Sequence, residues 1–309
     1  MEKAEMNIKE KQMMTNEQLE SELKFLRNKE RLSKILTYGS GAAMILTFMV
    51  GIVPLAVILL IVALVSGYQL SKNSSTIKKL LGDHIVGNVL NEVFNNVDYN
   101  PFGKIESVSS AGMVFPFSFE KVTGNDHVKA NYKGLKIELS DIELYHVEDY
   151  YDDEKDRWEE HEQKVFEGQW LICDFGKELS GEVHLSKNTK KLRKQHKNDS
   201  VEMGNPEFNN QFLVTAPNKQ EAHYILTPSM MKYILTIADK SSGDIYFSFL
   251  RDGKLHIAVQ TGHDFFELGK TEANIDKLRQ KFLNELQWFT DIVDELRLES
   301  SLYEDTTNS

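Results

Sequence analysis

One long segment without charge constrains this chain most. Residues 35–71 contain no Asp, Glu, Lys, Arg or His, and 26 of these 37 residues are hydrophobic. A membrane-spanning helix needs roughly 20 apolar residues, so the segment is nearly long enough for two spans. Gly51 and Pro54 lie at its midpoint, where a turn is needed, and proline ends a helix because it lacks a backbone N–H. The sequence therefore predicts a transmembrane helical hairpin, with spans at about 35–50 and 52–70, in preference to one over-long helix.

The positions of the basic residues predict how this hairpin is oriented. Basic side chains lie on both flanks of the segment and none lies between the two spans. Because cytoplasmic flanks carry an excess of Lys and Arg, we expect a multi-pass protein of the cell membrane with both termini in the cytoplasm. The flanking residues are Lys24, Arg27, Lys29, Arg31 and Lys34 before the spans, and Lys72, Lys78 and Lys79 after them.

The first span contains a cluster of small residues at positions 39–43. Small residues let helices approach closely within lipid. Two interpretations stay open, namely packing of the two hairpin helices on each other and a homo-oligomer that forms through this span. Since neither span contains an Asp, Glu, Lys, Arg or His, the sequence offers no proton relay or ion site, and the hairpin is interpreted as an anchor.

Residues 1–34 form an N-terminal cytoplasmic segment in which Thr15 and Gln18 fit a helix capping box. Leu19, Leu23 and Leu26 then recur at helical spacing. This pattern predicts a short amphipathic helix, which would form a coiled coil, lie on the bilayer or dock on the soluble domain. Residues 1–12 and the tail at 301–309 are predicted to be disordered.

Residues 72–300 are predicted to form a cytoplasmic α+β domain of antiparallel strands packed with helices. Short, closely spaced segments rich in β-branched and aromatic residues favour antiparallel pairing, and a long C-terminal helix follows at 272–300. The predicted strands are 114–119, 135–147, 164–174, 181–185, 211–216, 221–226, 245–250 and 254–260, and the other predicted helices are 77–93 and one that begins at Thr227-Pro228.

An acidic segment is the sharpest local anomaly in charge. Residues 141–162 hold 11 acidic residues against two basic ones, which gives −9 of the chain's net charge of −11. We interpret the middle of this segment as an acidic loop that is solvated or binds a basic partner. Calcium is the other candidate ligand, but the spacing does not fit an EF-hand. The candidate residues are Asp149, Asp152, Asp153, Glu154 and Asp156.

A basic segment at residues 187–197 has the opposite charge and contains no acidic residue. Clusters of four to eight basic residues bind anionic lipids when they lie close to a membrane, so this segment is a candidate lipid-binding loop. Nucleic-acid binding is not expected, because no aromatic residues interleave and the domain is acidic. The candidate residues are Lys187, Lys190, Lys191, Arg193, Lys194 and Lys197.

Catalytic and cofactor motifs are missing from the sequence. No Gly-rich phosphate loop, nucleophile elbow or zinc-binding histidine pair occurs, so no catalytic residue, metal or cofactor is predicted. Cys173 is the single cysteine, and it lies in a predicted strand among apolar neighbours. We interpret it as a buried, inert thiol.

Several strand and turn segments resemble the uncharacterised bacterial membrane proteins of domain-of-unknown-function family 3137. The resemblance extends over about residues 20–270 and implies a membrane anchor with a cytoplasmic domain, but no activity. The segments that carry it are 134–144, 165–175, 205–208, 220–228, 247–249 and 255–258.

The expected function is therefore that of a membrane-anchored cytoplasmic binding or scaffolding module. A peripheral domain that senses anionic lipid is one alternative. An enzyme whose site is not visible in the sequence is the other.

Overall fold

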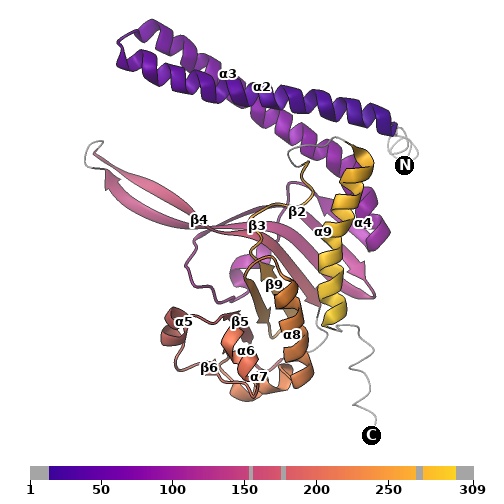
Figure 1. The fold of residues 1–309 in the computed structure, drawn as a ribbon. Helices are drawn as coiled ribbons and strands as arrows, with labels where there is room; N and C mark the ends of the chain where they lie inside the picture. Colours follow the sequence, from indigo (N-terminus) through magenta and orange to yellow (C-terminus); the bar gives the residue numbers. More distant parts are fainter. Residues whose placement is uncertain (1–13, 153–155, 175–178, 269–273, 297–309) are drawn as a thin grey trace, which may run out of the picture. The chain divides into compact units, whose positions relative to one another are not determined.

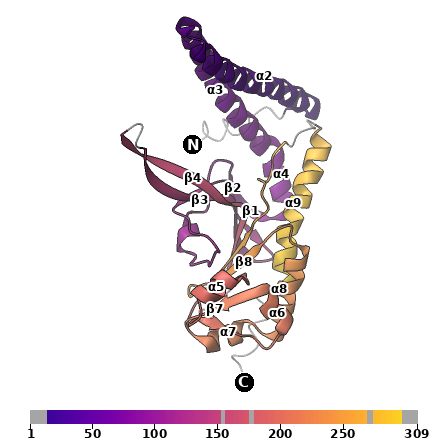
Figure 2. The ribbon, with the colours of Figure 1, turned by 60° about the vertical axis from the view of Figure 1, so that its left-hand side comes forward.

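The computed structural model describes residues 14–152, 156–174, 179–268 and 274–296. The disorder predicted for residues 1–12 and 301–309 lies outside these ranges. The chain divides into a helical unit, residues 1–89 and 267–283, and a sheet unit, residues 90–266 and 284–309. Each unit is described by itself below (Figures 1 and 2).

The helical unit is built around a hairpin of α2 (Asn16–Met49) and α3 (Val53–Leu81). The predicted capping box begins α2, since the Gln18 N–H donates to Thr15 Oγ1 at 3.3 Å and the Thr15 N–H donates to Gln18 Oε1 at 3.0 Å. The turn between the helices is made possible by Gly51, whose φ of +82° is a conformation that glycine adopts at little cost. The break predicted near Gly51 and Pro54 is therefore present. A π-helical turn, η1 (Gly82–Val86), and α4 (Gly87–Val93) continue the chain.

Small and polar side chains are buried in the hairpin while its large apolar side chains are exposed. Ser40, Ala56 and Ser66 are buried, and the hydroxyl groups of Thr37 and Ser66 form a hydrogen bond of 2.9 Å from helix to helix. Of the small residues at positions 39–43, Ser40 is buried whereas Gly39 and Ala42 are exposed, so both interpretations of this cluster stay open.

The three N-terminal leucines do not support a coiled coil between chains. Leu19, Leu23 and Leu26 are only 3%, 0% and 7% exposed in the single chain. A seam for pairing with a second copy needs exposed apolar positions.

The sheet unit contains one nine-stranded antiparallel sheet with the order β1-β2-β3-β4-β9-β8-β5-β7-β6. The α+β class predicted from the sequence is therefore confirmed, with two apolar helices followed by an antiparallel sheet, helices and a C-terminal helix. The strands are β1 (Asn95–Asn100), β2 (Lys121–Tyr132), β3 (Leu135–Asp152), β4 (Arg157–Asp174), β5 (Val183–Lys187), β6 (Ser200–Val201), β7 (Phe212–Thr215), β8 (Ile245–Phe249) and β9 (Lys254–Val259).

Helices accompany the second half of the sheet. They are α5 (Lys190–Gln195), α6 (Pro206–Gln211), α7 (Lys219–Ile225), α8 (Pro228–Lys240) and α9 (Ile275–Glu295). The predicted start of α8 is confirmed, because Thr227 Oγ1 accepts the Met230 N–H at 3.2 Å and Pro228 occupies the first turn. In the sheet unit, α9 places Phe289 edge-on against Phe265, with 5.0 Å between the ring centroids.

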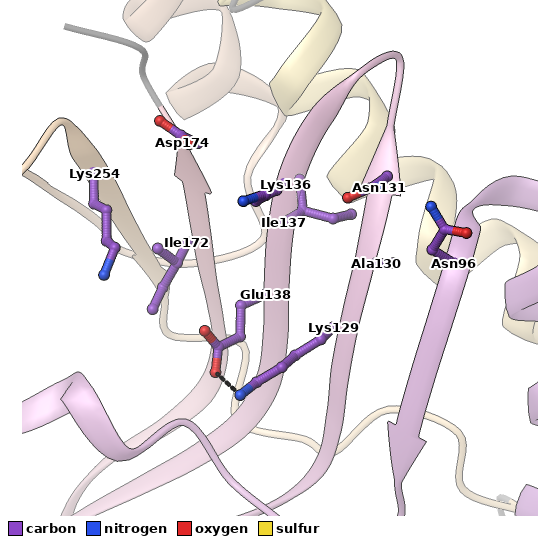
Figure 3. A pocket seen from close by; sticks show the side chains of 10 residues that line it. All are labelled: Asn96, Lys129, Ala130, Asn131, Lys136, Ile137, Glu138, Ile172, Asp174 and Lys254. Atoms are coloured by element: carbon purple, nitrogen blue, oxygen red, sulfur yellow. Dashed lines mark ion pairs between the residues drawn. The ribbon is translucent and has the colours of Figure 1, made fainter.

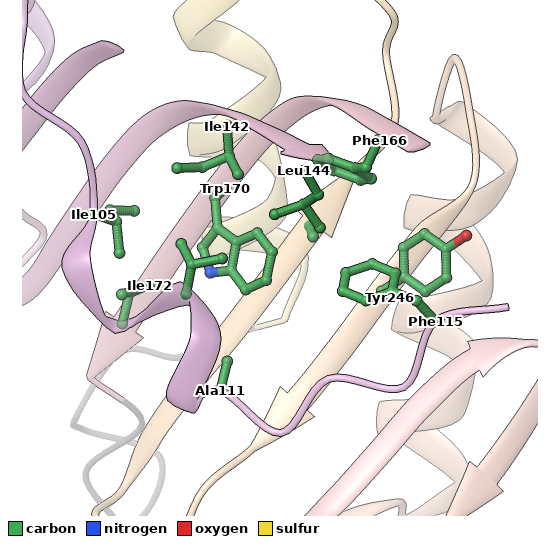
Figure 4. Packing of buried hydrophobic residues seen from close by; sticks show 11 residues of the cluster. Ile105, Ala111, Phe115, Ile142, Leu144, Phe166, Trp170, Ile172 and Tyr246 are labelled. Atoms are coloured by element: carbon green, nitrogen blue, oxygen red, sulfur yellow. The ribbon is translucent and has the colours of Figure 1, made fainter. Parts of the chain in front are cut away.

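One face of the sheet is covered by an aromatic core (Figure 4). Trp170 on β4 and Tyr246 on β8 are both fully buried, with β9 between their strands, and the Phe115 ring lies 4.6 Å from the Tyr246 ring. The segment that leads from the 3₁₀ helix η2 (Glu106–Ser110) to Phe119 supplies the covering side chains. The core residues are Ile105, Val108, Ala111, Phe115, Ile142, Leu144, Phe166, Trp170, Ile172, Tyr246 and Ala258.

Two of the predicted strands are wrong. Residues 114–119 cross the core instead of joining the sheet, so their alternation reflects burial of one side of an irregular segment. Residues 221–226 mostly belong to α7, whose N-cap Asn218 accepts the Gln220 N–H at 3.0 Å. A capped helix start thus prevails over the strand propensity of the following residues.

Candidate functional site

A two-stranded ribbon, which we call the arm, extends β3 and β4 beyond the rest of the sheet (Figures 1 and 2). It consists of residues 145–152 of β3 and 157–164 of β4. The β2 ladder begins where Lys121 pairs with Tyr145, and β9 pairs with β4 only from Gln169 onward. Beyond Tyr145, no described strand pairs with the outer edge of the arm on either side.

Most of the segment predicted to contain an acidic loop lies in the arm, where it is paired as strands. The β3–β4 ladder continues through Tyr150↔Glu159 and Tyr151↔Trp158 to Asp152↔Arg157. Side chains that face each other across strands stabilise a ribbon, and the rings of Tyr151 and Trp158 make such a pair with 5.5 Å between centroids. The Tyr150 hydroxyl also donates to Glu159 Oε2 at 2.9 Å.

The predicted acidic residues do not converge on one point of the arm. Asp149 is exposed on β3, and Asp156 accepts a hydrogen bond from the Tyr151 hydroxyl in the turn. Asp152 lies at the end of β3, while Asp153 and Glu154 lie outside the described residues. Within the described part of the chain, no group of three or more His, Cys, Asp or Glu is arranged to hold a metal ion.

Large aromatic side chains are exposed on the arm beside the carboxylates. Trp158 is 70% exposed, Tyr150 is 47% exposed and Tyr151 is 44% exposed. Exposed apolar surface that is rimmed by polar groups marks interaction sites. The arm therefore presents aromatic rings, carboxylates and unpaired backbone edges together.

Ion pairs hold the base of the arm to the sheet. Lys121 Nζ lies 2.8 Å from Glu162 Oε1, and Lys164 bridges Glu143 and Glu167. Burial tends to raise the pKa of Glu143, but hydrogen bonds from Lys164, Tyr145 and Thr123 lower that pKa overall.

A histidine at the arm's base adds a further polar contact. The His146 ring bonds Glu148 and Glu120 at 3.0 and 2.9 Å, and these bonds raise the pKa of His146. The lysine partners of Glu143 and Glu162 lie outside the acidic segment, so the charge pattern of that segment alone did not indicate them.

The basic segment forms a short helix, α5, instead of a loop. Leu192 is buried beneath it, Lys187 pairs with Asp244 at 2.8 Å, and Lys191 donates to the Pro116 carbonyl at 3.0 Å. In the part of the chain that the structure describes, the other four basic residues have no ion-pair partner. They are Lys190, Arg193, Lys194 and Lys197, and all four are exposed.

One serine, histidine and carboxylate arrangement resembles a hydrolase triad but has the wrong hydrogen bonds. The Ser248 hydroxyl is buried and donates to the Ala111 carbonyl at 2.5 Å. His184 Nδ1, at 2.7 Å from Ser248 Oγ, must therefore donate to that oxygen and cannot accept its proton. A general base has to accept the nucleophile's proton, so this arrangement is structural.

The single cysteine is buried, as the sequence indicated. Cys173 has no exposed surface, and burial raises the pKa of its thiol. Since the thiolate is the reactive form, Cys173 is not an activated nucleophile.

Comparisons with known proteins match part of the chain to a family without assigning a function. The family model described as "Protein of unknown function (DUF3137)" matches residues 164–298, so the resemblance noted in the sequence is confirmed over that range. No curated protein matches the chain. A similar solved structure is the crystal structure of the mycobacterial trehalose monomycolate transport factor A, TtfA. It is 10% identical, the match covers 70% of this chain and 95% of that chain, and the TM-score is 0.33.

Proposed function

We propose that this chain, whose residues 164–298 carry the DUF3137 domain, is a membrane-anchored binding module that recruits a basic protein partner through its arm. The observation that carries the proposal is the acidic, aromatic ribbon that stands clear of the sheet.

The apolar hairpin supports the anchor. Two helices, Asn16–Met49 and Val53–Val93, are long and apolar enough to cross a membrane, and only 11% of the most apolar window of each is buried. Residues such as Phe48 and Leu64 are 68% and 65% exposed, which would be costly in water and favourable in lipid. We propose that the chain is multi-pass in the cell membrane with both termini in the cytoplasm.

The chemistry of the arm defines the partner. The free edges of β3 and β4 offer backbone N–H and C=O groups to an added strand. Carboxylates such as Asp149 and Glu160 attract basic side chains, and exposed Trp and Tyr rings bind Lys or Arg cations through their faces. The occupant that matches all three features is an extended segment rich in Lys and Arg.

Site-specific photo-crosslinking in native membranes tests this proposal. A photo-crosslinking amino acid placed at Trp158 should form a product with a protein segment rich in Lys and Arg. The matched control is Tyr224, an aromatic residue of α7 that is 62% exposed, and it should not form that product.

Charge reversal on the arm provides a second test. Glu160→Lys together with Asp149→Lys should abolish the crosslink from position 158, because the cation would then be repelled. A crosslink that survives charge reversal, or that forms equally from position 224, would contradict recruitment by the arm.

A second candidate function is binding of anionic lipid by the basic segment. The observation in its favour is that Lys190, Arg193, Lys194 and Lys197 are exposed without ion pairs among the described residues. Liposome flotation tests this candidate function. The full chain in nanodiscs is mixed with neutral or with anionic liposomes, and the amount recovered with the floating liposomes is measured. Equal recovery with both vesicle types would reject lipid sensing.

A further inference from the structure

A cavity of about 320 Å³ opens on one face of the sheet, away from the arm (Figure 3). Five adjacent strands build it, namely β1, β2, β3, β4 and β9. We call it the lysine pocket. It is lined by Asn96, Lys129, Ala130, Asn131, Lys136, Ile137, Glu138, Ile172, Asp174 and Lys254.

The strand register brings the polar side chains of the lysine pocket together. Glu138 lies opposite Lys129 on one side and Ile172 on the other. Directly opposed residues in an antiparallel sheet share a face, so these side chains form a row across three strands. Two positions away, Asn131 faces Lys136 and Asp174 faces Lys254, which makes a second row on the same face.

A β-bulge brings an amide to the edge of the lysine pocket. The register between β1 and β2 shifts between Asn95 and Asp98, and Asn96 within this irregularity has a φ of +53°. Bulges redirect side chains and occur often beside functional sites. Figure 3 shows the Asn96 side chain on β1 at one end of the pocket.

The ammonium groups of the lysine pocket form only long or exposed ion pairs among the described residues. Lys136 has no ion-pair partner in the described part of the chain. Lys129 lies 3.9 Å from Glu138, whose carboxylate already bonds His127 Nε2 at 2.6 Å. Lys254 pairs with Asp252 at 3.3 Å, and both of these side chains are about half exposed. Exposed pairs of this kind contribute little stability, so the ammonium groups can pair with an incoming anion.

The floor of the pocket is apolar. Its apolar side chain on this face is Ile172, which lies opposite Glu138 and is 5% exposed. Ala130 and Ile137 also line the pocket, but they oppose each other one position along, so their side chains point to the other face of the sheet. Since one water occupies roughly 30 Å³ of the liquid, the cavity has room for a group several times larger than an inorganic ion. Its polar and apolar parts therefore fit one ligand that has a charged end and an apolar body.

We propose that the lysine pocket binds a small organic phosphate, with the phosphate among Lys129, Lys136 and Lys254 and the apolar body over Ile172. A phosphate monoester carries close to two charges and three acceptor oxygens, which three ammonium groups satisfy better than they satisfy a carboxylate. The amides of Asn96 and Asn131 supply further hydrogen bonds. The phosphate can belong to a soluble metabolite or to a lipid headgroup.

Calorimetric titration of the full chain in nanodiscs of neutral lipid tests the pocket. The probe is hexyl phosphate, with inorganic phosphate and hexanol as partial ligands that each lack one half of it. We expect hexyl phosphate to bind at least tenfold more tightly than either partial ligand. Equal affinity for inorganic phosphate and hexyl phosphate would overturn the role of the apolar floor.

Paired lysine variants locate the binding. The double variant Lys136→Gln with Lys254→Gln should bind hexyl phosphate at least tenfold more weakly, because charged hydrogen bonds are lost. The control, Lys219→Gln with Lys232→Gln, changes the net charge equally on exposed residues elsewhere and should leave the affinity unchanged. Equal loss in both pairs, or no loss in the first at an unchanged melting temperature, would overturn the site.

Competition identifies the source of the phosphate. Phosphatidic acid added to the nanodiscs should displace hexyl phosphate if a lipid headgroup is the ligand. Binding that is unaffected by phosphatidic acid supports a soluble metabolite. Neither result depends on the arm, so phosphate binding by the lysine pocket and partner recruitment by the arm are tested independently of each other.

Discussion

Gly168 in β4 is a position where a single added methyl group should be costly. It lies directly before the β4–β9 ladder begins at Gln169↔Val259. A Cβ at this position would lie 1.9 Å from the Val259 carbonyl oxygen and 2.9 Å from the Thr261 nitrogen, whereas real Cβ contacts essentially never come under 3.0 Å. In Gly168→Ala, the β9 backbone would therefore have to retreat by roughly 1 Å.

The free-energy cost follows from the hydrogen bonds that such a retreat breaks. The Gly262 N–H donates to the Glu167 carbonyl at 2.9 Å, and the first bonds between β4 and β9 lie beside it. Each lost backbone bond costs about 1 kcal/mol, and more where a buried group is left unpaired. We expect Gly168→Ala to lower the free energy of unfolding by about 3 kcal/mol. For a domain of this size, this corresponds to about 6–12 °C in melting temperature.

Thermal unfolding of the full chain in detergent, followed by near-ultraviolet circular dichroism, measures this effect. The matched control is Gly204→Ala, because a Cβ there meets no atom within 4 Å. A tolerated Gly-to-Ala change stabilises by about 0.4–1 kcal/mol, so the control should melt at or slightly above the wild-type temperature. If Gly168→Ala melts within about 2 °C of the wild type, the close approach of β4 and β9 is not rigid and the reasoning fails.

Three further predictions concern a hydroxyl, a histidine and the membrane topology. The Tyr246 hydroxyl is buried without a hydrogen-bond partner in the described structure, so Tyr246→Phe should leave urea stability unchanged or raise it by about 1 kcal/mol; a clear loss would reveal a partner. Burial lowers the pKa of His256 from 6.5 to about 4, so the folded state holds the ring neutral. The free energy of unfolding therefore falls by up to about 3 kcal/mol as the pH falls from 6.5 to 4. His256→Gln should remove that part of the pH dependence of urea unfolding, and identical pH profiles would contradict the assignment. An impermeant maleimide on intact cells should label Val50→Cys but not Lys197→Cys, while the buried native Cys173 stays unlabelled; the opposite pattern would invert the proposed topology.

The hairpin was predictable because its signals are local. A charge-free run long enough for two spans, with Gly51 and Pro54 at its midpoint, requires no knowledge of distant residues. The start of α8 was equally accessible, since Thr227 and Pro228 form a cap and a first turn within a few residues. Both features depend on interactions between near neighbours in the sequence.

The arm was not predictable in this way. Its high charge is typical of a loop, and its strands are fixed by pairing across a turn, as in Tyr151↔Trp158, instead of by an apolar face against a core. A period-2 pattern requires one buried face, and the arm has none beyond its base. The sequence therefore indicated the charge of this surface without its shape.

The lysine pocket illustrates a different limit. Its residues extend from Asn96 to Lys254, and the strand register alone brings them together. Lys136 and Lys254 carry no local motif, and each is an ordinary surface lysine when it is viewed along the chain. A site of this kind becomes visible only when the order of the strands is known.

The strand order also has a consequence for the time course of synthesis. The last third of β4, at Gln169–Asp174, pairs with β9 at Lys254–Val259, some 85 residues later in the chain. At about 5–20 residues per second, a ribosome needs several seconds to produce that partner. During this interval Trp170 and Ile172 lack their neighbouring strand, while the apolar hairpin has already been made. A chaperone that covers nascent β4 until β9 has been made would therefore raise the yield of folded protein.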